Sequence, residues 1–169
     1  FTYTLKMKHL SIFLGIFLAL AASRFIPHPP NYTNLIALSF YVPAFLGIKF
    51  IPLVVLSFFI TDLYFGFHSS LFFTWGSVIL IGYIPLFFKD SISSRLLGAS
   101  SGAILFYIVT NFGVWASGSY SYTLEGLVNC YILAIPFFWP MLVSTIAYSL
   151  IIELSYKIYT KGFKKVGVS

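Results

Sequence analysis

The sequence predicts an all-α fold: a polytopic membrane helical bundle of about six transmembrane helices, built as a single domain over residues 1–169 with both termini cytoplasmic. Of its 169 residues, 59% are hydrophobic and only 8% are charged, whereas about 25% are charged in an average soluble domain. The apolar runs are long and continuous, without strand alternation, and helices are the way to satisfy the backbone of such runs in lipid. The basic residues lie beside the ends of these runs.

The chain has room for six or seven spans with short connections, since one span needs about 20 residues. We place the spans at 9–25, 35–48, 50–67, 71–88, 96–117 and 132–156. The first segment also resembles a secretory signal, because Lys6 and Lys8 precede an apolar run that ends in small residues; we interpret it as a retained first helix. The second segment is short, and Pro43, Lys49 and Pro52 predict a tight hairpin between it and the third.

The charges orient the bundle. The net charge is +6, from ten Lys and Arg against four Asp and Glu. With six spans, one side of the membrane receives Lys6, Lys8, Lys49, Lys89, Arg95, Lys157, Lys161, Lys164 and Lys165. Arg24 falls on the other side, so the positive-inside rule predicts that both ends of the chain are cytoplasmic. Asp90 and Glu153 are expected near the inner surface as ordinary charges, and the absence of a basic stripe argues against nucleic acid as a partner.

Polar residues outside this pattern gather toward the outer face in three separate segments. They are Arg24, His28, Asn31 and Thr33, then Asp62 and His68, then Asn111, Trp115, Tyr120, Tyr122, Glu125, Asn129 and Tyr131. Ionisable groups at membrane depth usually pair or line a cavity. We therefore predict a pocket that binds a small, planar or polar molecule and is lined by Arg24, His28, Asn31, Asp62, Trp115 and Asn129.

Each part of this pocket has a plainer alternative. Asp62 needs a partner, which is either a substrate or Arg24 in an ion pair that only fixes helix packing. The proline-rich segment 25–33 is either a cap that presents His28 and Asn31 or a rigid turn. Trp115 either stacks on a planar ligand or belongs to an interfacial aromatic belt.

Catalysis is not expected. The sequence has no Ser/His/Asp arrangement, paired carboxylates on one helix or phosphate-binding glycine loop, so we predict no enzyme, no catalytic residues and no cofactor. Cys130 is the single cysteine, and His28 has no second His or Cys at ligand spacing, so no metal site is predicted.

Small residues form two helical series. Gly15, Ala19 and Ala22, followed by Ser23, lie on the first span, and Gly98, Ser101 and Gly102 lie on the fifth. Such series allow helices to approach closely. Gly15, Ala19 and Ala22 are our candidate surface for docking a partner, although packing within the bundle is the more frequent use of such residues.

Three motifs carry a family resemblance: 24–33 (RFIPHPPNYT), 62–66 (DLYFG) and 129–138 (NCYILAIPFF). They resemble an uncharacterised bacterial membrane family with an HPPN outer-loop motif, which is similar in turn to the S components of energy-coupling-factor vitamin transporters. The likeness covers about residues 24–156. It implies a six-helix subunit that binds a micronutrient from outside and works with a transmembrane coupling subunit and two ATPases. No vitamin-specific signature is present.

The expected function is therefore a membrane-embedded substrate-binding subunit for uptake of a small, vitamin-like nutrient, surrounded by the lipid bilayer and energised by separate subunits. The alternative is a structural or accessory subunit of a larger membrane complex, since the aromatic surface suits contacts with neighbouring chains, lipids or pigments. An independent channel or carrier fits less well, because the inner half has few polar pore-lining residues.

Overall fold

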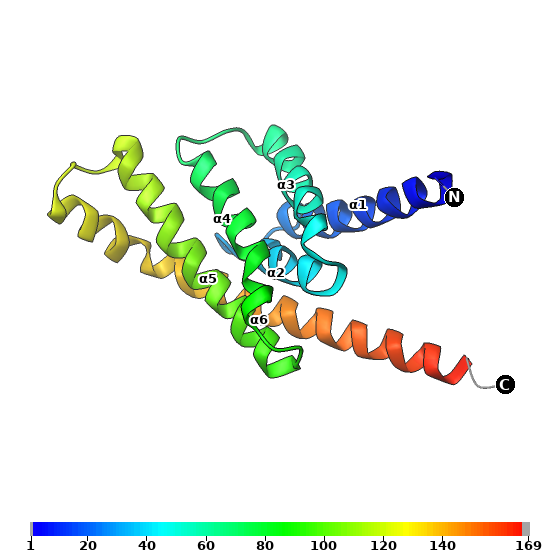
Figure 1. Cartoon of the computed structure of the whole chain (residues 1–169). Coiled ribbons are helices and arrows are strands. Elements are labelled where there is room, and N and C mark those ends of the chain that lie inside the picture. Colours follow the sequence, from blue (N-terminus) through cyan, green and yellow to red (C-terminus); the bar gives the residue numbers. More distant parts are fainter. Residues whose placement is uncertain (1, 167–169) are drawn as a thin grey trace.

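The computed structural model describes the backbone of residues 2–166 and the side chains of residues 10–160. Within this range the chain is helical throughout, with short connections (Figure 1). The elements are α1 (Thr2–Phe25), α2 (Leu35–Leu46), η1 (Ile48–Phe50), α3 (Ile51–Phe65), α4 (Leu71–Tyr83), η2 (Ile84–Phe87), α5 (Ile92–Val114), the π-helical η3 (Trp115–Ser119) and α6 (Leu124–Val166). The predicted all-α bundle is confirmed.

Successive helices run in opposite directions, so the connections divide between two ends of the bundle. One end lies toward the right and bottom of Figure 1 and contains the start of α1, the α2–α3 turn, the α4–α5 turn and the end of α6. The other end lies toward the left and top and contains the α1–α2, α3–α4 and α5–α6 connections. We call these the terminal end and the loop end. The predicted hairpin at Lys49 is the η1 turn, where Gly47 adopts a φ of 98° that suits glycine.

Helices α1, α5 and α6 are longer than predicted, and α1 begins at Thr2 and not at residue 9. The Ser91 side chain caps α5 by accepting a hydrogen bond from the Ser94 backbone N–H at 3.3 Å, so the helix starts at Ile92 and not at residue 96. Helix α6 runs for 43 residues despite Pro136 and Pro140, whereas we expected 132–156. At 1.5 Å per residue this is roughly 65 Å, about twice the hydrocarbon thickness of a bilayer.

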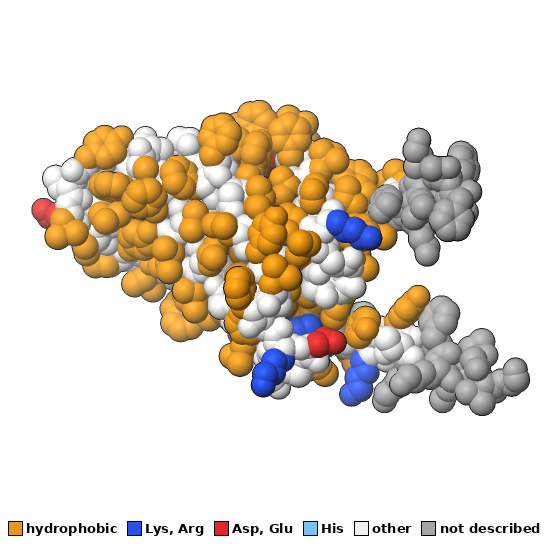
Figure 2. Space-filling model, viewed as in Figure 1, with side chains coloured by type: hydrophobic (Ala, Val, Ile, Leu, Met, Phe, Trp, Pro, Cys, Tyr) orange, Lys and Arg blue, Asp and Glu red, His pale blue; other side chains and the backbone are white. Residues whose placement is uncertain are grey.

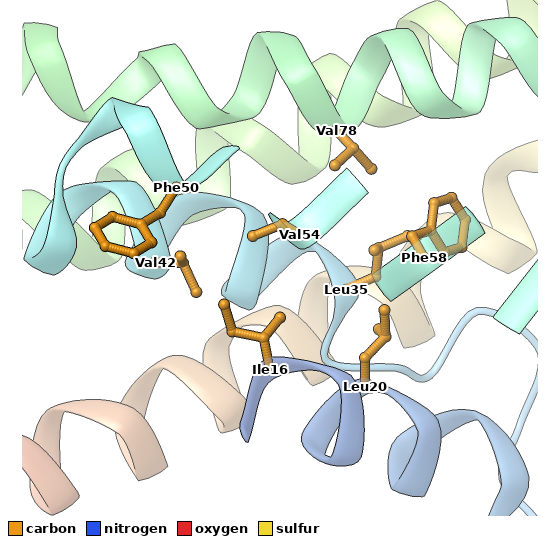
Figure 3. Close-up of a cluster of buried hydrophobic side chains, with 8 residues drawn as sticks. All are labelled: Ile16, Leu20, Leu35, Val42, Phe50, Val54, Phe58 and Val78. Carbon is orange, nitrogen blue, oxygen red and sulfur yellow. The ribbon is translucent and has the colours of Figure 1, made fainter. Parts of the chain in front are cut away.

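Helix α2 is the centre of the bundle although it has only 12 residues. One of its faces contributes Leu35 and Val42 to a core with residues of α1, η1, α3 and α4 (Figure 3). The other contributes Ile36 and Phe40 to a second core with residues of α4, α5 and α6. A helix too short to cross a bilayer is stable here because protein covers it on both faces.

Glycines let α5 approach this centre. A Cβ atom at Gly98 would lie 2.5 Å from Cε2 of Phe40, and one at Gly102 would lie 3.1 Å from Cγ2 of Ile81. The series on the fifth span therefore serves packing inside the bundle. Gly15 differs, because a Cβ there would meet nothing within 4 Å, and Ala19 and Ala22 are exposed like Gly15.

The terminal end holds a buried ion pair that the sequence analysis missed. Arg95 donates from Nε and Nη2 to both carboxylate oxygens of Glu153, at 2.6 and 2.7 Å, and also contacts Asp90. Glu153 is only 5% exposed. Our expectation of an ordinary surface charge was therefore wrong for Glu153, because the longer α5 and α6 place Arg95 and Glu153 face to face inside the bundle.

The surface of the described part is largely apolar (Figure 2). Three helical segments are long and apolar enough to cross a membrane: 48–65, 92–119 and 124–160. Three apolar segments are shorter: Leu10–Phe25, Leu35–Leu46 and Leu71–Phe87. An apolar surface of this extent together with these helices indicates an integral membrane protein.

The glycine contacts predict the outcome of a matched pair of substitutions. Gly98→Ala forces a methyl group against the buried Phe40 ring and should destabilise the bundle by about 1–3 kcal/mol. Gly15→Ala places the same methyl group in open space and should not lower stability. Thermal unfolding of both variants in detergent checks this; equal midpoints would contradict the packing described here.

Candidate functional site: a cavity at the loop end

A cavity of about 450 Å³ lies at the loop end, and each of the six α-helices contributes to its wall. Its polar lining from α1, α3 and the first two loop-end connections consists of Arg24, His28, Asn31, Thr33, Asp62 and His68. Aromatic side chains on α3, α5 and α6 supply much of the rest, including Phe58, Phe65, Phe106, Phe137 and Phe138. Its volume and mixed lining are typical of small-molecule sites.

An ion pair joins two walls of the cavity. Nη1 of Arg24, in the last turn of α1, lies 2.6 Å from Oδ1 of Asp62 in α3. Asp62 is 2% exposed, so its charge must be compensated within the protein. The guanidinium carbon also lies 4.8 and 4.7 Å from the ring centres of Phe58 and Phe65, where cation–π attraction adds to the contact.

Two further side chains hold this pair in place. Trp75 of α4 donates its indole N–H to the second oxygen of Asp62 at 2.9 Å. Thr61 accepts a hydrogen bond from Nη1 of Arg24 and donates its own proton to the Phe58 carbonyl. Helices α1, α3 and α4 are thus tied together at one carboxylate, which gives the cavity wall a fixed geometry.

The proline-rich connection is anchored at both ends. Ser23 donates to Oδ1 of Asn34 at 2.7 Å, and Nδ2 of Asn34 donates to the Ala19 carbonyl at 2.8 Å. Between them Asn31 adopts a φ of 62°, a conformation that asparagine tolerates better than most residues. The connection is therefore a stiff segment whose His28 and Asn31 side chains line the cavity.

A polar stripe on α5 forms the facing wall. Tyr107, Thr110 and Asn111 line the cavity together with Val114, at the i, i+3, i+4 and i+7 spacing of one helix face. Tyr107 donates to the Tyr131 carbonyl at 2.5 Å, which fixes α5 to α6 beside the cavity. This spacing is visible in the sequence, but we did not use it to choose site residues.

The structure brings together four of the six residues predicted to bind substrate: Arg24, His28, Asn31 and Asp62 line the cavity. It places Trp115 and Asn129 elsewhere. Trp115 begins the π-helical turn and donates its indole N–H to the Ser121 carbonyl at 3.0 Å. Asn129 is exposed on α6, because helical rotation directs its neighbour Cys130 inward, against the Asn111 carbonyl.

Comparison with known proteins identifies a family but no activity. A model of a family of unknown function, DUF6580, matches residues 5–166. The chain belongs to this family. The match contains the three motifs on which the resemblance to an uncharacterised membrane family depends. No curated protein and no solved structure matches the chain significantly.

The lining of this DUF6580 cavity suits recognition by hydrogen bonds and ring contacts. Among the described residues, no group of three or more His, Cys, Asp or Glu side chains comes together as a metal site would need. Arg24, the imidazoles and the α5 stripe offer donors and acceptors, and the phenylalanines offer flat apolar surfaces. These groups can hold and orient a small molecule.

Proposed function

We propose that this chain is a membrane-embedded subunit that captures a small, vitamin-like nutrient from outside the cell for uptake by separate energising subunits. The observation that carries the proposal is the cavity, since residues from six helices form a recess of about 450 Å³ at one end of an apolar bundle. An ion pair and an anchored proline-rich segment pre-form its wall, which lowers the cost of ordering on binding.

The charge distribution supports a cavity that faces outward. Three exposed lysines lie at the terminal end: Lys49 in the α2–α3 turn, Lys89 in the α4–α5 turn and Lys157 in α6. Figure 2 shows Lys and Arg side chains gathered toward that side. By the positive-inside rule this end faces the cytoplasm of a bacterial inner membrane, with both termini inside. The cavity, at the loop end, then opens to the exterior.

Energising partners are part of the proposal, because the resemblance to S components implies a transmembrane coupling subunit and ATPases. The exposed face of α1 with Gly15, Ala19 and Ala22 is the docking surface we propose for the coupling subunit. Support comes from the contrast with α5, whose glycines are covered inside the bundle while Gly15 is open.

Retention of a small molecule tests the binding role. Ala134→Phe fills the cavity and Thr33→Val removes one lining hydroxyl, so both should reduce the amount of small molecule that co-purifies after gentle extraction, by at least about tenfold for Ala134→Phe. Asn129→Ala, outside the cavity, is the control. Mass spectrometry measures the retained molecule, and equal retention by all four proteins would contradict the proposal.

Cysteine labelling tests the orientation. In a Cys130→Ser background, Glu125→Cys at the loop end should react with a membrane-impermeant maleimide in intact cells. Lys89→Cys should react only after the membrane is opened, because positively charged loops remain in the cytoplasm. The reverse labelling pattern would contradict the proposal that the cavity opens to the exterior.

Co-purification tests the docking surface and the alternative role. Gly15→Leu should reduce recovery of a coupling subunit and ATPases while leaving thermal stability unchanged, since a bulky side chain blocks close helix approach. Gly76→Leu on α4, where a Cβ also has open space, is the matched control. Recovery of the chain in one large stoichiometric complex without ATPases would instead support an accessory subunit.

A further inference from the structure

We infer that the cavity binds an uncharged small molecule in which a hydrogen-bond acceptor is attached to an aromatic or similarly flat apolar portion. This inference rests on the proposed function and specifies the class of nutrient. It follows from three properties of the lining: its net charge, the free donors of Arg24 and the neighbouring rings.

The first property is charge balance. Arg24 and Asp62 are the charged side chains among the described residues that line the cavity, and they pair with each other at 2.6 Å. Apart from the imidazoles of His28 and His68, the lining therefore carries no net charge. A charged ligand would bring a charge into this recess without a free counterion, which is costly in a poorly hydrated site.

The second property is that both carboxylate oxygens of Asp62 already accept a hydrogen bond, whereas two nitrogens of Arg24 donate none within the described part of the chain. One oxygen of Asp62 accepts from Arg24 and the other from Trp75. Arg24 uses only Nη1 in its hydrogen bonds, so within the described part of the chain Nε and Nη2 remain available as donors. The pair thus presents the cavity with N–H donors whose positive charge is already neutralised, and Asp62 acts as a positioning residue.

The third property is the apolar surroundings of these donors. The guanidinium lies against Phe58 and Phe65, and Phe106 and Phe138 line the cavity from α5 and α6. A ligand acceptor held by Arg24 therefore continues into a region where flat rings can stack. In the described part, the side chains of Asn31 and Thr33 make no hydrogen bond, so they remain available for a second polar group.

An anion is disfavoured by the same geometry. A carboxylate bound to the free nitrogens of Arg24 would share one guanidinium with Asp62, which cannot move into solvent at 2% exposure. Two carboxylates at short distance would then depend on a single positive charge, and like charges at such a distance repel strongly in a low-dielectric site.

Nicotinamide and nicotinate provide matched probes, because both are planar rings of nearly equal size and differ in net charge. Purified protein in detergent at pH 8 is titrated with each probe to about 10 mM, the range in which fragments of this size bind, and the thermal midpoint gives the dissociation constant. We expect nicotinamide to bind at least about tenfold more tightly than nicotinate. Benzamide and benzoate repeat the comparison without the ring nitrogen.

A change of lining charge supplies a second readout. Asp62→Asn removes the negative charge and leaves Arg24 uncompensated, so the preference should move toward nicotinate by at least about tenfold. Asn129→Ala should leave the preference unchanged. Should Asp62→Asn fail to fold, the wild-type comparison still decides the proposal.

The outcomes separate this inference from the proposed function. Tighter binding of the uncharged probes supports both. Equal or tighter binding of the anions to the wild-type cavity contradicts the inference that the ligand is uncharged, but it still supports the cavity as a small-molecule site. Absence of binding by all four probes counts against the cavity as a site for flat small molecules and therefore against both proposals.

Discussion

The arrangement of the loop end depends on the complete burial of one carboxylate. Asp62 is 2% exposed in a bundle with few other charges, and an unpaired charge in such surroundings would cost several kcal/mol. Arg24 and Trp75 supply its two partners from α1 and α4. The requirement to pair Asp62 therefore brings three helix ends together, and the cavity is the space between them and the polar stripe of α5.

The terminal end also contains a buried carboxylate that must be paired, but the recess beside its partner Arg95 is much smaller than the cavity at the loop end. Arg95 and Glu153 form a bidentate pair between α5 and α6, and the recess that adjoins Arg95 has a volume of about 90 Å³. Close packing explains the difference, since Gly98 brings α5 against Phe40 of the central helix α2. At the loop end the helices diverge around the cavity, and the bundle is therefore packed tightly at one end and hollow at the other.

A bundle that is hollow at one end and tightly packed at the other suits the proposed role in substrate binding. A recess that opens at one face and is closed by a dense core beneath it can retain a molecule without conducting it through the bundle. The site carries hydrogen-bond donors beside apolar rings, a combination typical of small-molecule sites. Energy for movement across the membrane would then have to come from other subunits, consistent with an exposed small-residue face on α1.

The sequence by itself determined the all-α class, the order of the helices, the tight turn at Lys49 and the three segments that supply polar residues, because apolar length and turn chemistry are local properties. Only the tertiary structure decided which of those residues meet. Asn111 faces the cavity and Asn129 does not, because the rotation of each helix depends on what it packs against. Arg95 is likewise buried because α5 and α6 place Glu153 beside it, a contact between residues far apart in the chain that no local pattern specifies.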